Sequence, residues 1–339
     1  MNINGNASVL REINTYIVRQ ILKSEKLATK QQIAEISGLS TVTVSTIIQR
    51  LLEDNQVFEA DQAPSSGGRP AHQFCFNENH SHVLVLFTHE QFGQDILHLC
   101  VANLYGECVK TQSVPLDKIE LNTFAPWIDA YLEEFPTIRA IGFGLPGLEV
   151  NGKIVVLDYP ALVGKKLTQY YSDRYQLPVI FENDVNAAVM GYCKKKGEPS
   201  GTTVIYTYFP KKYPPGAGIY IDGKLYKGMS NYAGEFGVIP FEINWQDLAL
   251  YQNVDQYGPA ISKVIIAMSG LLNPQKIILF GDFLTPETLE KIKQLCALAL
   301  PATAVPELFL SDNFTDDYQR GMVSVALEVL EPQINLIAS

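Results

Sequence analysis

The sequence of 339 residues is poor in cysteine and histidine, with five of each, and it contains no C-x-x-C pair. The cysteines are scattered along the chain, which excludes a disulfide framework and a structural zinc site of the usual spacing. All five histidines precede residue 100, and none forms a metal-like constellation with other ligands. From these absences we expect a protein that works in a reducing compartment without a metal ion or cofactor.

Long apolar runs and an excess of positive charge are also missing. No apolar run reaches the ~18 residues that a membrane-spanning helix needs, and the first residues show no basic region followed by an apolar stretch. The 36 acidic residues outnumber the 26 basic ones, giving a net charge of −10. This argues against a surface that coats nucleic acid or anionic lipid as a whole, although a local DNA-binding patch is compatible with it. We therefore predict a cytoplasmic protein with no membrane partner.

The first 78 residues have the pattern of a small separate domain, in a chain whose length fits about two domains. A predicted helix spans residues 7–24. Its apolar residues recur at the 3–4 spacing of a single buried stripe: Leu10, Ile13, Ile17 and Ile21. Thr29 can then cap a second helix over residues 30–37, and Gly38 supplies a tight turn before a third helix. This order is the pattern of a helix-turn-helix.

The third helix begins after Ser40 or Thr41, either of which can cap it, and runs to about residue 54. At about 100° per residue, its apolar side chains share one narrow face. The opposite face of its first half carries hydroxyl, amide and methyl groups, which fit base edges in the major groove of DNA. The predicted DNA contacts of this domain are Lys30, Ser40, Thr41, Val42, Ser45, Thr46, Gln49, Arg50, Gly68 and Arg69.

Two short strands around a tip at residues 64–70, rich in glycine, proline and serine, predict a wing after the third helix. Arg69, between Gly68 and Pro70, sits on an extended backbone from which it can enter a narrow minor groove. Residues 1–78 contain seven basic and eight acidic side chains, so we expect few phosphate contacts and a shallow salt dependence. A protein-interaction module is the alternative interpretation, because helix-turn-helix patterns can mislead.

The remaining chain, residues 79–339, predicts an α/β body with two lobes. Strand-like runs alternate with helical segments of ~10–15 residues, which favours parallel or mixed sheets with covered faces, and no internal repeat is visible. Residues 142–147 formally match the G-x-G-x-x-G dinucleotide pattern. That fingerprint needs a helix directly afterwards, whereas a hairpin with an Asn151-Gly152 turn is expected here. We reject a Rossmann site and keep only the loop at the end of a strand as a place for a ligand.

Two further segments carry candidate site residues. Asn183 and Asp184 lie at a predicted strand-to-helix junction, where an Asp can simply cap the helix. Alternatively, the amide and carboxylate bind adjacent hydroxyls of a polyol, or Asp184 acts as a base. Glu235 lies in a glycine-rich loop and is either a solvated turn residue or a ligand-binding carboxylate.

Taken together and in order, these motifs resemble the ROK family (repressors, open reading frames and sugar kinases). The motifs are the helix-turn-helix with residues 66–70 behind it, the loop at 144–147, and the segments 177–188, 218–228 and 233–237. The likeness is to the branch of xylose and N-acetylglucosamine repressors. It implies an N-terminal winged helix-turn-helix, an actin-like, sugar-kinase body with a cleft between its lobes, and a homodimer or tetramer. It also implies that Asn183, Asp184 and Glu235, with Gly147, contact a sugar.

The chain departs from the family's kinases at three places. Residues 87–94 lack the glycine pair of the first phosphate loop, and residues 208–215 replace the second with prolines, which offer no N–H to phosphate. Residues 238–245 lack the family's zinc-binding cysteines, and Val238 replaces a histidine that touches zinc and sugar. Asp184 matches the kinases' base, but a base without positioned phosphate cannot run phosphoryl transfer. We expect no kinase activity.

These considerations predict a DNA-binding transcriptional regulator, a repressor of sugar-utilisation genes, whose partners are an operator duplex and a sugar or sugar derivative. The first alternative is an ATP-dependent sugar kinase with an appended interaction domain. The second is a regulator that has lost its small-molecule ligand and responds to a protein partner.

Overall fold

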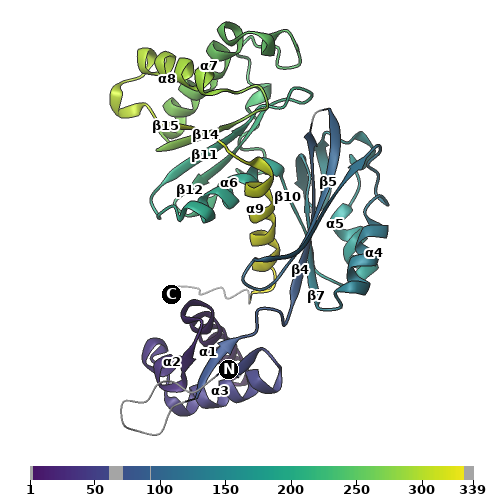
Figure 1. The fold of residues 1–339 in the computed structure, drawn as a ribbon, viewed down its shortest axis with the longest axis vertical. Helices are drawn as coiled ribbons and strands as arrows, with labels where there is room; N and C mark the ends of the chain where they lie inside the picture. Colours follow the sequence, from purple (N-terminus) through teal and green to yellow (C-terminus); the bar gives the residue numbers. More distant parts are fainter. Residues whose placement is uncertain (1–2, 61–71, 92, 332–339) are drawn as a thin grey trace.

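The computed structural model describes residues 3–60, 72–91 and 93–331, and it has an N-terminal helical part below a larger body (Figure 1). Gly68, Arg69 and the rest of the expected wing tip lie outside the described residues. Among the helices that are described, none combines the length and the apolar character needed to cross a bilayer.

The N-terminal part contains three helices and a small antiparallel sheet of strand order β1-β3-β2. The helices are α1 (Ile3–Glu25), α2 (Lys30–Ser37) and α3 (Thr41–Glu53), and the strands are β1 (Ala28–Thr29), β2 (Val57–Ala60) and β3 (Gln73–Phe76). Thr29 caps α2 in a capping box with Gln32, and Gly38 ends α2 with a φ of 71°. Ser40, rather than Thr41, caps α3 by accepting a hydrogen bond from the Thr43 N–H. The predicted second and third helices and the turn between them are present.

The buried stripe expected along α1 is only partly correct. Leu10 is 54% exposed, and the buried side chains of this helix are Val18, Ile21 and Leu22 in its second half. The second half packs on α2, α3 and β3, whereas Leu10 in the first half borders an open hollow beside α3, so spacing alone could not tell which turns would be buried.

The first sheet of the body has the order β10-β7-β4-β5-β6. Its strands are β4 (His82–Gln91), β5 (Gln94–Ala102), β6 (Cys108–Leu116), β7 (Ile138–Gly144) and β10 (Val179–Glu182). Strands β4, β5 and β6 form an antiparallel meander, while β7 and β10 join in parallel. The helices of this lobe are α4 (Ala125–Glu134) and α5 (Leu167–Tyr175), and the hairpin expected after residue 147 is formed by β8 (Gly147–Val150) and β9 (Lys153–Leu157).

The second sheet, of order β13-β12-β11-β14-β15, repeats this topology: two antiparallel pairings followed by two parallel ones. Its strands are β11 (Thr203–Tyr208), β12 (Gly216–Ile221), β13 (Lys224–Leu225), β14 (Lys276–Phe280) and β15 (Glu307–Leu310), with helices α7 (Val254–Leu272) and α8 (Pro286–Ala299). Short 3-10 turns lie at Pro160–Leu162, Phe236–Val238, Leu250–Gln252 and Ala302–Ala304. The body is therefore a structural repeat that the sequence analysis did not detect, because matching topology needs no matching residues.

Helices α6 (Asp184–Lys196) and α9 (Phe314–Glu328) cross between the two sheets (Figure 1). Their backbones touch at a reciprocal pair of glycines. A Cβ on Gly191 would lie 1.8 Å from the Asp317 carbonyl oxygen, and a Cβ on Gly321 would lie 1.8 Å from that of Ala187. One apolar cluster contains residues of both sheets and both helices. This crossing joins the two lobes and places the start of α6 at the opening between them.

Candidate functional site

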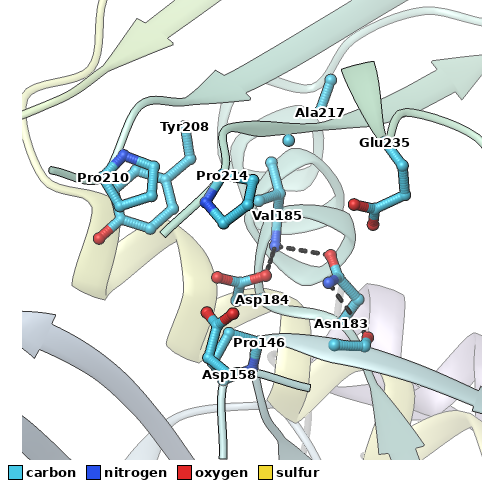
Figure 2. A pocket seen from close by; sticks show the side chains of 12 residues that line it. Pro146, Asp158, Asn183, Asp184, Val185, Tyr208, Pro210, Pro214, Ala217 and Glu235 are labelled. Atoms are coloured by element: carbon cyan, nitrogen blue, oxygen red, sulfur yellow. Dashed lines mark hydrogen bonds between the residues drawn. The ribbon is translucent and has the colours of Figure 1, made fainter. Parts of the chain in front are cut away.

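A small cavity of about 90 Å³ lies between the lobes, lined by residues that follow β7 and β10 on one side and by residues of β11, β12 and their connection on the other (Figure 2). Its lining residues are Pro146, Gly147, Asp158, Asn183, Asp184, Val185, Tyr208, Pro210, Pro214, Gly216, Ala217 and Glu235. All four residues predicted to contact a ligand, Gly147, Asn183, Asp184 and Glu235, belong to this lining. Residues almost 90 positions apart in the sequence are thus brought to one cavity.

The junction of β10 and α6 fixes the first two of these side chains. Asn183 is the N-cap: its Oδ1 accepts hydrogen bonds from the N–H groups of Val185 (3.0 Å) and Asn186 (3.1 Å). Its Nδ2 donates to the Gly147 carbonyl oxygen at 3.2 Å, which ties the loop after β7 to the helix. The helix-capping role considered for Asp184 therefore belongs to Asn183. Asp184 Oδ1 accepts a hydrogen bond from the adjacent Val185 N–H, at 2.9 Å.

Three carboxyl groups meet in this cavity. In Figure 2 those of Asp158 and Asp184 point toward one another, with Glu235 across the cavity. Burial, followed by the charges of Asp184, Glu235 and Asp95, raises the pKa of Asp158 to about 8. Burial, with Glu235 nearby, raises the pKa of Asp184 to about 7, and burial also raises that of Glu235. Near neutral pH the cluster shares protons, so it can both donate hydrogen bonds to hydroxyl groups and accept them.

Sequence reasoning missed Asp158. It directly follows β9, and its N–H donates to the Pro146 carbonyl oxygen at 3.3 Å, so the hairpin returns the chain to the cavity. The only available signal was an acidic residue at the end of a predicted hairpin strand. Such a position becomes informative only once the fold of the hairpin is known.

Glu235 depends on a close approach of two backbone segments. Gly234 has a φ of 95°, and a Cβ there would lie 1.8 Å from the Ala217 carbonyl oxygen. The Ala217 N–H in turn donates to the Gly234 carbonyl oxygen at 2.9 Å. Only glycine fits this conformation and this space, so the glycine-rich loop serves to direct the next residue, Glu235, into the cavity.

The two stretches compared above with phosphate loops differ from open loops. Strand β4 continues to Gln91 and pairs with β5 from Val83 to Gln91, so a β-ladder occupies residues 87–91. In the second stretch, Lys212 Nζ lies 3.8 Å from Asp95 Oδ2 on the opposite lobe. Tyr159 Oη donates to Thr88 Oγ1 (2.9 Å) beside it. Side chains of both lobes thus meet beside these two stretches.

At the other end of the molecule, the outward face of α3 is accessible. Val42 is 74% exposed, and Ser40, Thr41, Thr46, Gln49 and Arg50 are exposed with it, while Val44, Ile47 and Ile48 are buried. Ser45 is half-buried and accepts a hydrogen bond from Lys30 Nζ at 3.1 Å, which links α2 to α3. The structure therefore gathers eight of the ten predicted DNA contacts around α3. The other two, Gly68 and Arg69, lie outside the described residues.

Comparison with known protein families agrees with the fold described above. The model of the ROK family matches residues 91–248. This part of the chain therefore resembles the ROK family. Among curated proteins, the chain is 28% identical over 254 residues to the xylose repressor of Caldicellulosiruptor bescii, covering 72% of this chain and 62% of that protein. It is 25% identical to the xylose repressor of Bacillus subtilis (72% and 64% covered) and 23% identical to the DNA-binding transcriptional dual regulator NagC of Escherichia coli (70% and 60%). The chain spans about three-fifths of the length of these relatives.

Solved structures match the fold. A ROK family transcriptional regulator described as a homologue of the E. coli Mlc protein aligns with a TM-score of 0.70 at 17% identity, covering 95% of this chain and 98% of that one. The ROK hexokinase of Thermus thermophilus aligns with a TM-score of 0.59 at 17% identity, covering 74% of this chain and all of that one. The predicted resemblance to the ROK family and the predicted sugar-kinase-like α/β body are both confirmed.

Proposed function

We propose that this protein is a sugar-responsive transcriptional repressor. The observation that carries the proposal is the exposed face of α3, which offers short polar and methyl-bearing side chains while its opposite face is buried in the N-terminal core. Such a face fits the major groove, where hydroxyl and amide groups bond base edges and Val or Thr methyls meet thymine methyls. The names of the relatives, xylose repressors and NagC, support the same function.

In this proposal residues 1–78 form a winged helix-turn-helix DNA-binding domain, and residues 79–339 form the effector-binding body. Two observations support the division: the helices and three-stranded sheet before residue 77 share an apolar cluster whose fully buried members all precede residue 77, and the two larger sheets contain none of these strands. A homodimer, or a tetramer built from dimers, would place two α3 helices in successive major grooves, ~34 Å apart or a multiple of it.

The effector we propose is a neutral sugar. Its hydroxyls would bond Asp158, Asp184 and Glu235, with Asn183 and Gly147 shaping the wall beside them. The described lining contains no lysine, arginine or histidine, and the nearby Lys212 is paired with Asp95, so a phosphorylated or carboxylated sugar would meet a cluster of three acidic groups. This electrostatic argument favours an uncharged sugar over a sugar phosphate.

We further propose that the protein has no kinase activity and acts in the cytoplasm. Asp184 stands where the family's kinases carry a base, which is the observation that favours the rival function, an ATP-dependent sugar kinase. Against it, the β4–β5 ladder and the prolines of residues 210–215 leave few backbone N–H groups to hold phosphate, and phosphoryl transfer depends on that positioning.

Effector and DNA binding can be coupled through α6 and α9. The cavity lies at the start of α6, α6 packs against α9, and the segment after α9 contacts the N-terminal part. There, Lys23 Nζ of α1 lies 2.9 Å from Glu331 Oε1. A sugar that changes the angle between the lobes would move this contact, and coupling of ~1–3 kcal/mol is typical of such regulators.

The decisive test is DNA binding by the full chain to the duplex upstream of its own gene, measured by fluorescence anisotropy with and without neutral sugars. We expect Thr46→Ala and Gln49→Ala each to weaken specific binding by roughly 5- to 100-fold. Gln31→Ala, on the exposed side of α2, is the matched control and should bind normally. Equal affinity for all duplexes, or no effect of the α3 variants, would contradict the proposal.

Two further measurements separate the alternatives. Consumption of ATP with any common hexose or pentose would establish the kinase and remove the repressor-only proposal. Specific DNA binding with no response in calorimetry to any sugar, neutral or charged, would instead favour a regulator that responds to a protein partner, which a pull-down can then identify.

A further inference from the structure

Two of the five cysteines lie side by side at the edge of the first sheet. Cys100 is buried on β5 and Cys108 is exposed at the start of β6, and their Sγ atoms are 2.7 Å apart. The pairing of β5 with β6 is irregular here: a β-bulge between Val101 and Ala102 brings Cys108 opposite Ala102. A disulfide needs an S–S separation of about 2.05 Å, so the two sulfurs need to approach by less than ~1 Å to bond.

The environment of Cys108 favours its thiolate. Its sulfur accepts hydrogen bonds from Cys100 Sγ and from Gln319 Nε2 of α9, the latter at 3.1 Å. The hydrogen bond from Cys100, with the nearby charge of Arg320, lowers the pKa of Cys108 despite partial burial. The hydrogen bond to Cys108 and burial raise the pKa of Cys100. The pair thus combines an accessible thiol of lowered pKa with a buried thiol of raised pKa, which is the arrangement of a reactive and a resolving cysteine.

The two strands that carry this pair support the contact between the body and the N-terminal helices. The turn from Asn103 to Glu107 connects them, and the Oδ1 of Asn103 holds it by accepting the N–H groups of Tyr105 and Glu107, both at 3.0 Å. The Tyr105 ring packs against Phe76, with ring centroids 6.0 Å apart, and lies 3.5 Å from Lys26 Nζ. A bond between Cys100 and Cys108 would close the base of this turn.

We propose that Cys108 and Cys100 form a reversible oxidation site for hydroperoxides, and that their disulfide stiffens the turn on which the N-terminal helices rest. The Cys108 thiolate attacks the peroxide, an S–O bond forms and the O–O bond breaks, and the departing oxygen leaves as water or an alcohol after taking a proton. The Cys100 sulfur then attacks the sulfenic acid, the S–S bond forms, and the hydroxyl leaves as water with the Cys100 proton. The two sulfurs lose two electrons and the hydroperoxide gains them.

The chemical step is tested on the full reduced chain with hydrogen peroxide, followed by denaturation and labelling with N-ethylmaleimide. We expect three of the five cysteines to take the label after oxidation, and the peptides of Cys100 and Cys108 to be linked. Cys75→Ser, at a half-buried cysteine elsewhere, is the matched control and should still form the link. Cys100→Ser should stop at a sulfenic acid on Cys108, which dimedone traps. Five labelled cysteines, or linkage of any other pair, would overturn the proposal.

A kinetic measurement covers the case in which a cysteine variant folds poorly. In the native wild-type chain we expect iodoacetamide to label Cys108 at least ~10-fold faster than Cys75, because the thiolate is the reactive form. Arg320→Gln should reduce that preference, since it removes a positive charge near the sulfur. Equal labelling rates at the two cysteines would refute the assigned reactivity.

The structural consequence is tested separately by amide hydrogen exchange of residues 103–107 and 22–26 in the reduced and oxidised chain. We expect slower exchange in both segments after oxidation. Unchanged exchange would refute the stiffening, while the linked peptides would still establish the oxidation site. None of these readouts uses DNA or a sugar, so failure here is distinguishable from failure of the proposed repressor function.

Discussion

Replacing Asp158 with asparagine is expected to stabilise the protein in mildly alkaline solution. Burial and neighbouring acidic groups raise the pKa of Asp158 from 3.8 to about 8. The folded protein therefore retains a proton that the unfolded chain has already lost, and the free energy of unfolding falls as the pH rises between these values. At about 1.4 kcal/mol per pH unit, the full rise would correspond to ~6 kcal/mol for an isolated group.

We expect ~2 kcal/mol of this to be measurable, because water in the cavity and proton sharing with Asp184 reduce the effect. Asparagine has nearly the same size but does not ionise, so Asp158→Asn should remove this part of the pH dependence. Urea unfolding at about pH 5 and about pH 8.5 measures it. The variant should lose less stability than the wild type on going to the higher pH, and Asp117→Asn, at an exposed carboxyl, should behave like the wild type. Identical pH dependence in Asp158→Asn and wild type would refute the reasoning.

Three further substitutions test the packing. Gly321→Ala should lower the free energy of unfolding by ~2–4 kcal/mol, because the new Cβ would lie 1.8 Å from the Ala187 carbonyl oxygen. The control Gly270→Ala, whose Cβ would have nothing within 4 Å, should leave stability unchanged or raise it. Equal effects of the two variants in thermal unfolding would contradict the close contact of α6 with α9. Ser40→Ala should lower the free energy of unfolding by ~1 kcal/mol, because it removes the side chain that caps α3. Thr41→Ala, which leaves this cap in place, should change it little, and urea unfolding can check both variants. Lys276→Met should cost ~3 kcal/mol, because it leaves the carboxylate of Glu198, 5% exposed, without its partner at 2.7 Å. The control Lys293→Met removes an ion pair whose Glu290 is 64% exposed and should change stability by less than ~0.5 kcal/mol; a similar loss in both would refute the argument.

The sequence was most informative where local chemistry decides the structure. The bounds of α2 follow from the cap at Thr29 and the left-handed turn at Gly38, and both signals are carried by one or two residues. The hairpin β8–β9 follows from its Asn151-Gly152 turn in the same way. Local signals of this kind need no knowledge of the rest of the fold.

Features that depend on distant partners could not be predicted. Strand β6 lies at the edge of its sheet and contains Pro115. Because an edge strand has few buried neighbours, its residues do not alternate strongly between apolar and polar, and the sequence gives little sign of a strand. Leu10 has the right spacing on α1, but it lines an open hollow beside α3 and is 54% exposed. Asp158 belongs to the site only because a hairpin returns it to the cavity, and its raised pKa comes from groups that are remote in the sequence. The cavity residues that begin or precede a helix, or that follow a glycine, could be predicted from the sequence. Asp158 was missed, because only the tertiary structure brings it to the cavity.

The contact of α6 with α9 has a mechanical consequence for the two lobes. Side chains can adopt other rotamers when neighbours shift, but main-chain carbonyl groups in a helix cannot, and at Gly191 and Gly321 the facing surfaces are main chain. The halves of the body can therefore pivot about this point far more easily than they can separate there. The cavity lies near one end of α6, and Lys23 lies near the far end of α9. A small rotation of one lobe about the contact of these two helices would therefore move the N-terminal helices without disrupting the packing of the core.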